Sequence, residues 1–144
     1  MQVFTIGYTK KSAREFFGII KANEVGILID VRLYNNTQLA GFSKSRDLEF
    51  FLAELCGCGY VWAKQFAPNP ALFNEYKNGQ IDWAGYEAEY RDFLNAHPGL
   101  DFFRLYQGKR ICLLCAEDTP EHCHRRLLAE KIAGEYDDVT VTHL

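Results

Sequence analysis

The sequence lacks an apolar run long enough to cross a membrane. Such a span needs about eighteen uncharged apolar residues in succession, and charged residues interrupt every apolar stretch of this chain before that length. An excess of positive charge is also lacking, because the formal net charge is −3. The composition therefore excludes a general attraction to nucleic acid or anionic membranes, and any anion binding must come from local clustering.

Two signs of secretion are missing as well. Residues 1–8 contain no basic segment followed by an apolar run and a small-residue cleavage site. The five cysteines are an odd number, which does not suit the disulfide framework of a small secreted domain. We therefore expect a cytoplasmic protein whose cysteines are reduced thiols, metal ligands or catalytic groups. These cysteines are Cys56, Cys58, Cys112, Cys115 and Cys123.

Strand and helix patterns alternate along the chain. Short β-branched and aromatic runs predict strands at residues 3–8, 26–32, 60–66, 110–115 and 139–143. Capping signals and helical apolar spacing predict helices over residues 12–23, 45–57, 72–77, 82–96 and 119–136. This order predicts an α/β fold in a single domain, residues 1–144, with a mainly parallel sheet of about five strands and helices on both faces.

Polar segments follow three of the predicted strands, at residues 8–11, 30–46 and 115–126. Parallel sheets bind ligands at the carboxyl ends of their strands, so we expect these segments to meet at one edge. Basic residues are concentrated in or beside them, namely Lys10, Lys11, Arg32, Lys44, Arg46, Arg125 and Arg126. They predict a cationic rim suited to an anionic ligand, and the alternative is a solvated surface of mixed charge.

The last of these segments carries the most chemistry. If Thr119 caps a helix, Cys123 lies in its first turn, where the helix dipole favours the thiolate. Cys115, at the strand end, is then placed to act as a resolving partner. Alternatively, the two sulfurs and His124 hold a soft metal such as zinc, or the cysteines are packed core residues. The helix dipole favours Cys123 over Cys115 as the nucleophile.

Carboxylates accompany this predicted site. Glu117 and Asp118 lie near the predicted helix start, where they satisfy the dipole themselves and repel an anion, so they suit a metal or general-base role. Asp30 ends a buried strand and can be a general base, a metal ligand or an anchor for Arg32. The anchor is the commonest of these three roles.

Three motifs in this order resemble a known family. They are Thr5–Tyr8 (TIGY), Ile29–Arg32 (IDVR), and Cys115–Glu117 (CAE) followed by Pro120–Arg126 (PEHCHRR). The sequence resembles, over nearly its whole length, the bacterial and archaeal family known as domain of unknown function 488. The segment Gln38–Lys44 (QLAGFSK) is similar to one branch of it. The resemblance implies no reaction, but it implies that Gly7, Asp30, Arg32, Cys115, Glu117, Cys123, His124 and Arg125 matter.

A looser similarity is to rhodaneses and cysteine phosphatases, which also pair an Asp-Val-Arg strand end with a cysteine at a strand-to-helix turn. Those enzymes hold substrate in a short loop between the cysteine and an arginine. Here Arg125 lies ten residues after Cys115, and the loop between them is acidic. The similarity therefore does not extend to sulfur or phosphoryl transfer by that loop.

Together these observations predict an enzyme with a cysteine-centred site that acts on a small anionic or nucleotide-like substrate. The alternatives are a protein that binds zinc or iron, and a nucleotide or nucleic-acid binding module without catalysis. The expected catalytic residues are Cys115, Cys123, His124, Asp30 and Glu117. The expected substrate-binding residues are Arg32, Arg125, Gly7, Tyr8 and Lys44.

Overall fold

The computed structural model describes residues 1–36 and 40–144. The segment Gln38–Lys44 was compared above with one branch of a known family. Its first two residues lie outside the described residues. Within the two described ranges, every helix is too short or too polar to pass through a lipid bilayer.

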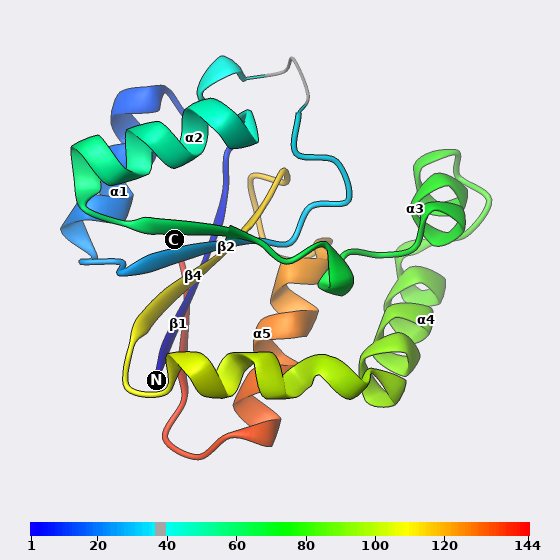
Figure 1. The fold of residues 1–144 in the computed structure, drawn as a ribbon. Helices are drawn as coiled ribbons and strands as arrows, with labels where there is room; N and C mark the ends of the chain where they lie inside the picture. Colours follow the sequence, from blue (N-terminus) through cyan, green and yellow to red (C-terminus); the bar gives the residue numbers. More distant parts are fainter. Residues whose placement is uncertain (37–39) are drawn as a thin grey trace.

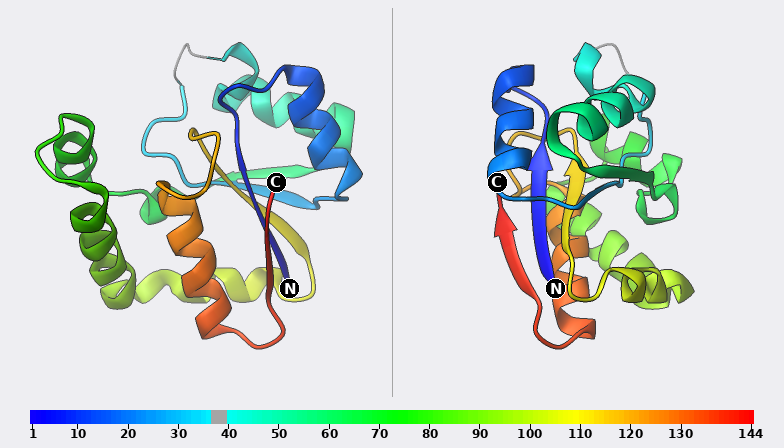
Figure 2. Two further views of the ribbon diagram at one scale, coloured as in Figure 1. Left: turned by 180° about the vertical axis from the view of Figure 1, so that it is seen from behind. Right: turned by 60° about the vertical axis from the view of Figure 1, so that its left-hand side comes forward.

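A parallel sheet of five strands forms the centre of the fold (Figure 1). The strands are β1 (Gln2–Gly7), β2 (Ile27–Asp30), β3 (Gly59–Trp62), β4 (Arg110–Cys115) and β5 (Thr140–His143). Their spatial order is β3-β2-β4-β1-β5, so β4 lies between the first two strands of the chain. Figure 2 shows β1, β4 and β5 running in the same direction. The predicted α/β fold is confirmed.

Helices cover both faces of this sheet. They are α1 (Ala13–Ala22), α2 (Ser45–Phe51), α3 (Pro70–Lys77), α4 (Trp83–Ala96) and α5 (His124–Glu135). Figure 1 shows α1 and α2 above the sheet and α5 below it. Side chains alternate between the faces of a strand. Accordingly, Cys112 and Leu114 of β4 pack with α1 and α2, whereas Ile111 and Leu113 pack with α4 and α5.

Local signals set several helix ends. Ser12 and Glu15 form the predicted capping box before α1, which satisfies backbone N–H groups that a helix start leaves unpaired. The Asp82 side chain caps α4 in a similar way. After α2, a π-helical turn (Leu52–Cys56) ends at Gly57. The φ of this glycine is 60°, in the left-handed region that glycine adopts without strain.

The structure differs from the sequence-based predictions in several local details. The strand predicted over residues 60–66 ends at Trp62, because the last residue of its partner strand, Asp30, pairs with Trp62. The following residues, Lys64–Phe66, form a 3-10 turn. The helix predicted over residues 45–57 begins as α2 at Ser45 and continues from Leu52 as a π-helical turn. Residues 98–106, for which no element was predicted, form a 3-10 segment.

Candidate active site

The carboxyl ends of the neighbouring strands β2 and β4 form the topological switch point of the sheet, where successive connections leave toward opposite faces. After β2 the chain passes to α2, on one face, and after β4 it passes to α5, on the other. Figure 1 shows α2 and α5 on opposite sides of these neighbouring strands. Ligands of open α/β sheets bind in the crevice at such a switch point. The strand ends that the sequence singled out therefore lie where this fold generally binds ligands.

Three of the predicted catalytic side chains meet at this edge. Cys115 is the last residue of β4, Cys123 directly precedes α5, and His124 is the first residue of α5. We call these three residues the thiol–imidazole cluster. Their sulfur and nitrogen donor atoms all lie within 4.8 Å of one another. All three side chains are buried, and only 7% of Cys115 and 2% of Cys123 is exposed.

The backbone fixes the protonation pattern of His124. Its Nε2 lies 2.7 Å from the carbonyl oxygen of Val31. A carbonyl can only accept a hydrogen bond, so Nε2 must carry a proton and donate it. In the neutral ring, Nδ1 therefore carries the lone pair, and it lies 3.6 Å from the sulfur of Cys115. The histidine is thus oriented to accept a proton from a thiol or to bind a metal ion.

The helix that carries this cluster starts later than predicted. Residues 120–123 form a turn in which the Cys123 N–H donates to the Pro120 carbonyl at 3.2 Å, and α5 begins at His124. The Thr119 side chain contacts the Glu121 carboxylate and caps no helix. Cys123 is therefore the N-cap residue of α5, and its side chain makes no capping hydrogen bond to the first turn.

The pKa values of the two thiols are shifted in opposite directions. Burial raises the pKa of Cys123, and the neighbouring Cys115 raises it further. The pKa of Cys115 is lowered, chiefly by a hydrogen bond from Cys123 and also by the Ala116 N–H, which together outweigh burial. These directions favour Cys115 as the more acidic thiol, and the choice of nucleophile stays a prediction.

Two tyrosine side chains of α4 pack against the thiol–imidazole cluster. The ring of Tyr90 meets the His124 ring edge to face, with centroids 5.5 Å apart, and its hydroxyl donates to the Phe66 carbonyl at 2.6 Å. Burial and the nearby cysteines raise the pKa of Tyr86. The helical spacing of these tyrosines in the sequence is typical of a core-facing stripe, but such spacing carries no signal for which residues they meet there.

Arg125 holds the loop between β4 and α5 from inside the protein. It is fully buried, and its guanidinium donates to the Glu117 carbonyl at 2.6 Å and to the Asp118 carbonyl at 3.3 Å. Its Nε also donates to the Thr5 hydroxyl at 3.4 Å. The predicted substrate-binding arginine is therefore a structural tie, and Glu117 takes part through its backbone while its side chain is exposed.

Gly7 allows the same loop to approach β1. A Cβ atom at this position would overlap the carbonyl oxygen of Glu117. The loop is further tied to the residues after β1, because both the N–H and the hydroxyl of Thr9 donate to the Ala116 carbonyl. The motif glycine thus serves close backbone packing. Its predicted contact with substrate stays a prediction.

A second group of side chains lies at the ends of β1, β2 and β3. The Asp30 carboxylate accepts bonds from Nε and Nη2 of Arg32 at 2.9 and 2.7 Å, from the Arg32 N–H at 3.1 Å, and from the Tyr60 hydroxyl at 2.7 Å. The guanidinium lies over the Tyr8 ring, 5.3 Å from its centroid. We call Asp30, Arg32, Tyr60 and Tyr8 the aspartate cluster. Asp30 is therefore the anchor among its three predicted roles.

The two clusters lie on opposite faces of the sheet. Arg32 donates to the Ser43 carbonyl at 2.7 Å, and Tyr8 is buried among residues of α1 and α2. Cys115 follows the alternation of β4 to the other face, beside α4 and α5. The backbone of β2 connects the clusters, since the Val31 carbonyl bonded to His124 lies between Asp30 and Arg32.

The remaining basic residues do not form one continuous rim. Lys11 contacts Asp118 at 3.3 Å, and Arg126 pairs with Glu130 at 2.8 Å. Lys44 is partly buried before α2. The exposed cations of the predicted set are Lys10 and Arg46.

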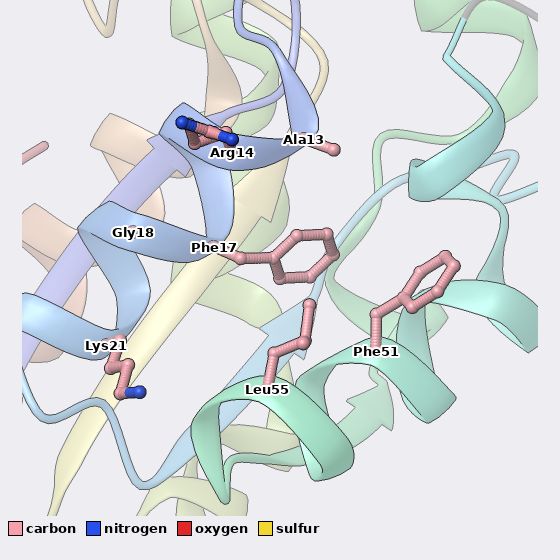
Figure 3. A pocket seen from close by; sticks show the side chains of 7 residues that line it. All are labelled: Ala13, Arg14, Phe17, Gly18, Lys21, Phe51 and Leu55. Carbon is pink, nitrogen blue, oxygen red and sulfur yellow. The ribbon is translucent and has the colours of Figure 1, made fainter.

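A separate surface groove lies between α1 and the end of α2. It has a volume of about 340 Å³, and Figure 3 shows Phe17, Phe51 and Leu55 facing one another there. Arg14 and Lys21 are the polar residues of its lining, which contains no thiol, imidazole or carboxylate. Among the described residues, the chemistry is therefore concentrated at the strand ends and not in this groove.

Fold and site together define an α/β protein with a parallel sheet and a buried cysteine–histidine centre at the carboxyl edge. The chain belongs to the family described as domain of unknown function DUF488, whose model matches residues 12–132. The match covers both clusters except Tyr8, and Gly7 also lies outside it. No curated protein and no solved structure matched the chain. The predicted family resemblance is confirmed.

Proposed function

We propose that this protein is an enzyme whose nucleophile is Cys115 and whose base is His124. One observation carries the proposal: Nδ1 of His124 lies 3.6 Å from the Cys115 sulfur, while its Nε2 is held by the Val31 carbonyl. A nucleophile, a base and a third group that orients the base are the parts of an activated nucleophile. A backbone carbonyl here takes the orienting place that a carboxylate has in many such sites.

The chemistry begins with a proton transfer. The Cys115 S–H proton moves to Nδ1 of His124, and the Val31 carbonyl stabilises the imidazolium through the Nε2–H bond. The Ala116 N–H and the Cys123 thiol stabilise the thiolate. The sulfur then bonds to an electrophilic atom of the substrate, and the departing group leaves with the electron pair and takes the proton from Nδ1.

Only a small substrate fits this arrangement, since 7% of Cys115 is exposed. The predicted anionic or nucleotide-like substrate has one observation in its favour. Nη1 of Arg32 is buried and has no hydrogen-bond partner within residues 1–36 and 40–144. A buried donor without a partner is costly, and an anionic group reaching the end of β2 would satisfy it.

Alkylation of the native protein over a pH series tests this proposal, with mass spectrometry assigning each labelled cysteine. Iodoacetamide is expected to label Cys115 well below the pKa of an ordinary thiol, about 8.5. Cys56 is the control within the chain, because burial raises its pKa. His124→Gln is expected to move Cys115 labelling to higher pH. Labelling of Cys115 no faster than Cys56 throughout the series contradicts the proposal.

Metal binding is the second candidate function, and the geometry of the donors favours it. Two sulfurs and one imidazole nitrogen lie within 4.8 Å of one another. His124 donates its other ring N–H to a backbone carbonyl, as metal-binding histidines usually do. Cys115, Cys123 and His124 would hold zinc or iron, and in a tetrahedral zinc site one position would stay open for water or substrate.

Elemental analysis of protein purified without a histidine tag separates the two candidates. A metal site predicts close to one zinc or iron per chain, lost in both Cys115→Ser and Cys123→Ser and kept in Cys56→Ser. It also predicts that Cys115 is alkylated only after chelation. Metal-free protein that does not bind added zinc rules this candidate out and leaves the thiol enzyme.

A further inference from the structure

Cys115 and Cys123 stand apart from the other buried cysteines. Cys58 and Cys112 lie in the core that α1 and α2 cover. The sulfurs of Cys115 and Cys123 lie at the opposite face, within 4.8 Å of each other and of the His124 ring nitrogen. Two thiols in contact beside a base are the composition of a dithiol that closes to a disulfide.

The backbone around Cys123 suits such a closure. A disulfide needs an S–S distance of about 2.05 Å, so the sulfurs must approach by less than about 3 Å. Cys115 is fixed in the central strand β4. Cys123 lies between a turn and the first residue of α5, with extended backbone angles, φ −140° and ψ 135°. It lies outside the regular elements, and two backbone hydrogen bonds of 3.2 Å, from its N–H to the Pro120 carbonyl and from the Arg126 N–H to its own carbonyl, hold it in place. A shift of Cys123 therefore strains these two bonds and leaves the rest of α5 intact.

We propose that Cys115 and Cys123 are a dithiol pair that reduces a small hydroperoxide. The inference rests on the proposed function, because it needs Cys115 as the nucleophile and His124 as the base. It adds a role for Cys123 and names a small neutral substrate in place of the anionic one. Small size follows from the burial of both sulfurs behind the loop and the tyrosines of α4.

The reaction takes two steps for hydrogen peroxide. In the first, the Cys115 proton moves to His124, the thiolate attacks one peroxide oxygen, and the O–O bond breaks. The departing hydroxide takes the proton from His124, which gives water and a Cys115 sulfenic acid. In the second, the Cys123 sulfur attacks the Cys115 sulfur and displaces hydroxide, which leaves as water with the Cys123 proton. Two thiols are oxidised to one disulfide, and one peroxide is reduced to two waters. Two external thiols then restore the pair and are themselves oxidised to a disulfide.

Peroxide treatment with thiol mapping tests this proposal on the whole chain. Reduced wild-type protein is treated with hydrogen peroxide and digested without reduction, and the expected product is a Cys115–Cys123 disulfide with one peroxide consumed per pair. Cys123→Ser is expected to stop at the sulfenic acid, which dimedone traps on Cys115. Cys115→Ser is expected to lose peroxide consumption. Cys56→Ser is the matched control and is expected to behave as wild type, and circular dichroism verifies that each variant is folded.

The outcomes separate this inference from the proposed function. If Cys115 of wild-type protein is alkylated readily but peroxide leaves a dimedone-reactive Cys115 and no disulfide, the dithiol pair is overturned and the nucleophile stands. If Cys115 resists both iodoacetamide and peroxide, both proposals fall. If peroxide oxidises the pair only after chelation of a bound metal, the metal site replaces both.

Discussion

The two clusters at the carboxyl edge of the sheet are built in different ways. In the aspartate cluster, the Asp30 carboxylate accepts four hydrogen bonds of 2.7 to 3.1 Å. In the thiol–imidazole cluster, the Cys115–His124 contact is 3.6 Å long. A buried ion pair held by several short hydrogen bonds keeps its geometry, and its loss is costly. A thiol beside a basic nitrogen can instead exchange a proton. The comparison indicates that the first cluster supports the fold and that the second is the one suited to reaction.

The largest expected effect is on stability and comes from the aspartate cluster. Asp30→Asn places an amide against the buried Arg32 guanidinium and leaves its charge uncompensated. Denaturant unfolding is expected to show a loss of about 3 to 5 kcal/mol. Cys115→Ser, at a site that is also buried, is expected to cost only about 1 kcal/mol.

Asp101→Asn is the control for the loss of a carboxylate, because its pair with Arg104 is exposed, and no measurable change is expected. The comparison breaks down if Cys115→Ser destabilises the protein as much as Asp30→Asn, since the thiol–imidazole cluster would then be structural too.

The second largest expected effect on stability comes from Gly7, against which the loop between β4 and α5 packs. Gly7→Ala forces a methyl group against the Glu117 carbonyl, and the loop must move. We expect the free energy of unfolding to fall by roughly 2 to 3 kcal/mol. Cys115 alkylation is also expected to change, because the loop carries Cys123.

Gly18→Ala in α1 is the matched control, since its added Cβ meets nothing within 4 Å. This variant is expected to gain about 0.5 to 1 kcal/mol through helix propensity. Equal stability of the two variants would show that the close approach at Gly7 does not constrain the loop.

The smallest expected effect is a pH dependence of stability that comes from His143 in β5, beside the residues that hold the same loop. His143 lies 2.7 Å from the Thr5 hydroxyl, to which Arg125 also donates. Burial lowers the pKa of His143, and the charges of Arg125 and Arg126 lower it further. Folding therefore favours the neutral ring. Its stabilising contribution is complete above the ordinary histidine pKa of about 6.5 and is lost as the pH falls below it.

Thermal unfolding at neutral and mildly acidic pH measures this contribution. His143→Gln is expected to lose less stability on acidification than wild type, by an amount smaller than either substitution above causes. An unchanged pH dependence would show that this histidine does not couple to the Arg125 tie.

The strands and the edge of the sheet could be predicted because their signals are local. The apolar run Arg110–Cys115 and the capping box before α1 depend on neighbouring residues alone, and both predictions are confirmed. The helix start near Thr119 was wrong, because a proline after a threonine fits a helix start and a turn equally well. Only the contacts of the finished loop distinguish them.

The division of the candidate site into two clusters could not be predicted. Each strand end was identified correctly, but which face Asp30 and Cys115 occupy depends on how separate strands align. A sequence does not state this alignment. Arg125 was interpreted as a rim cation because burial of a charge requires partners, and its partners are the backbone carbonyls of Glu117 and Asp118, which no residue type reveals.

The order of the strands has a consequence for how the chain acquires this site during folding. β1 and β2 each pair with β4 and are not neighbours. The first strands to leave the ribosome must therefore wait for residues 110–115 before the sheet can close. Pairings between such distant segments slow folding. Because Cys115 ends the strand that joins β1 to β2, the thiol–imidazole cluster forms in the same late event that joins these two strands into one sheet.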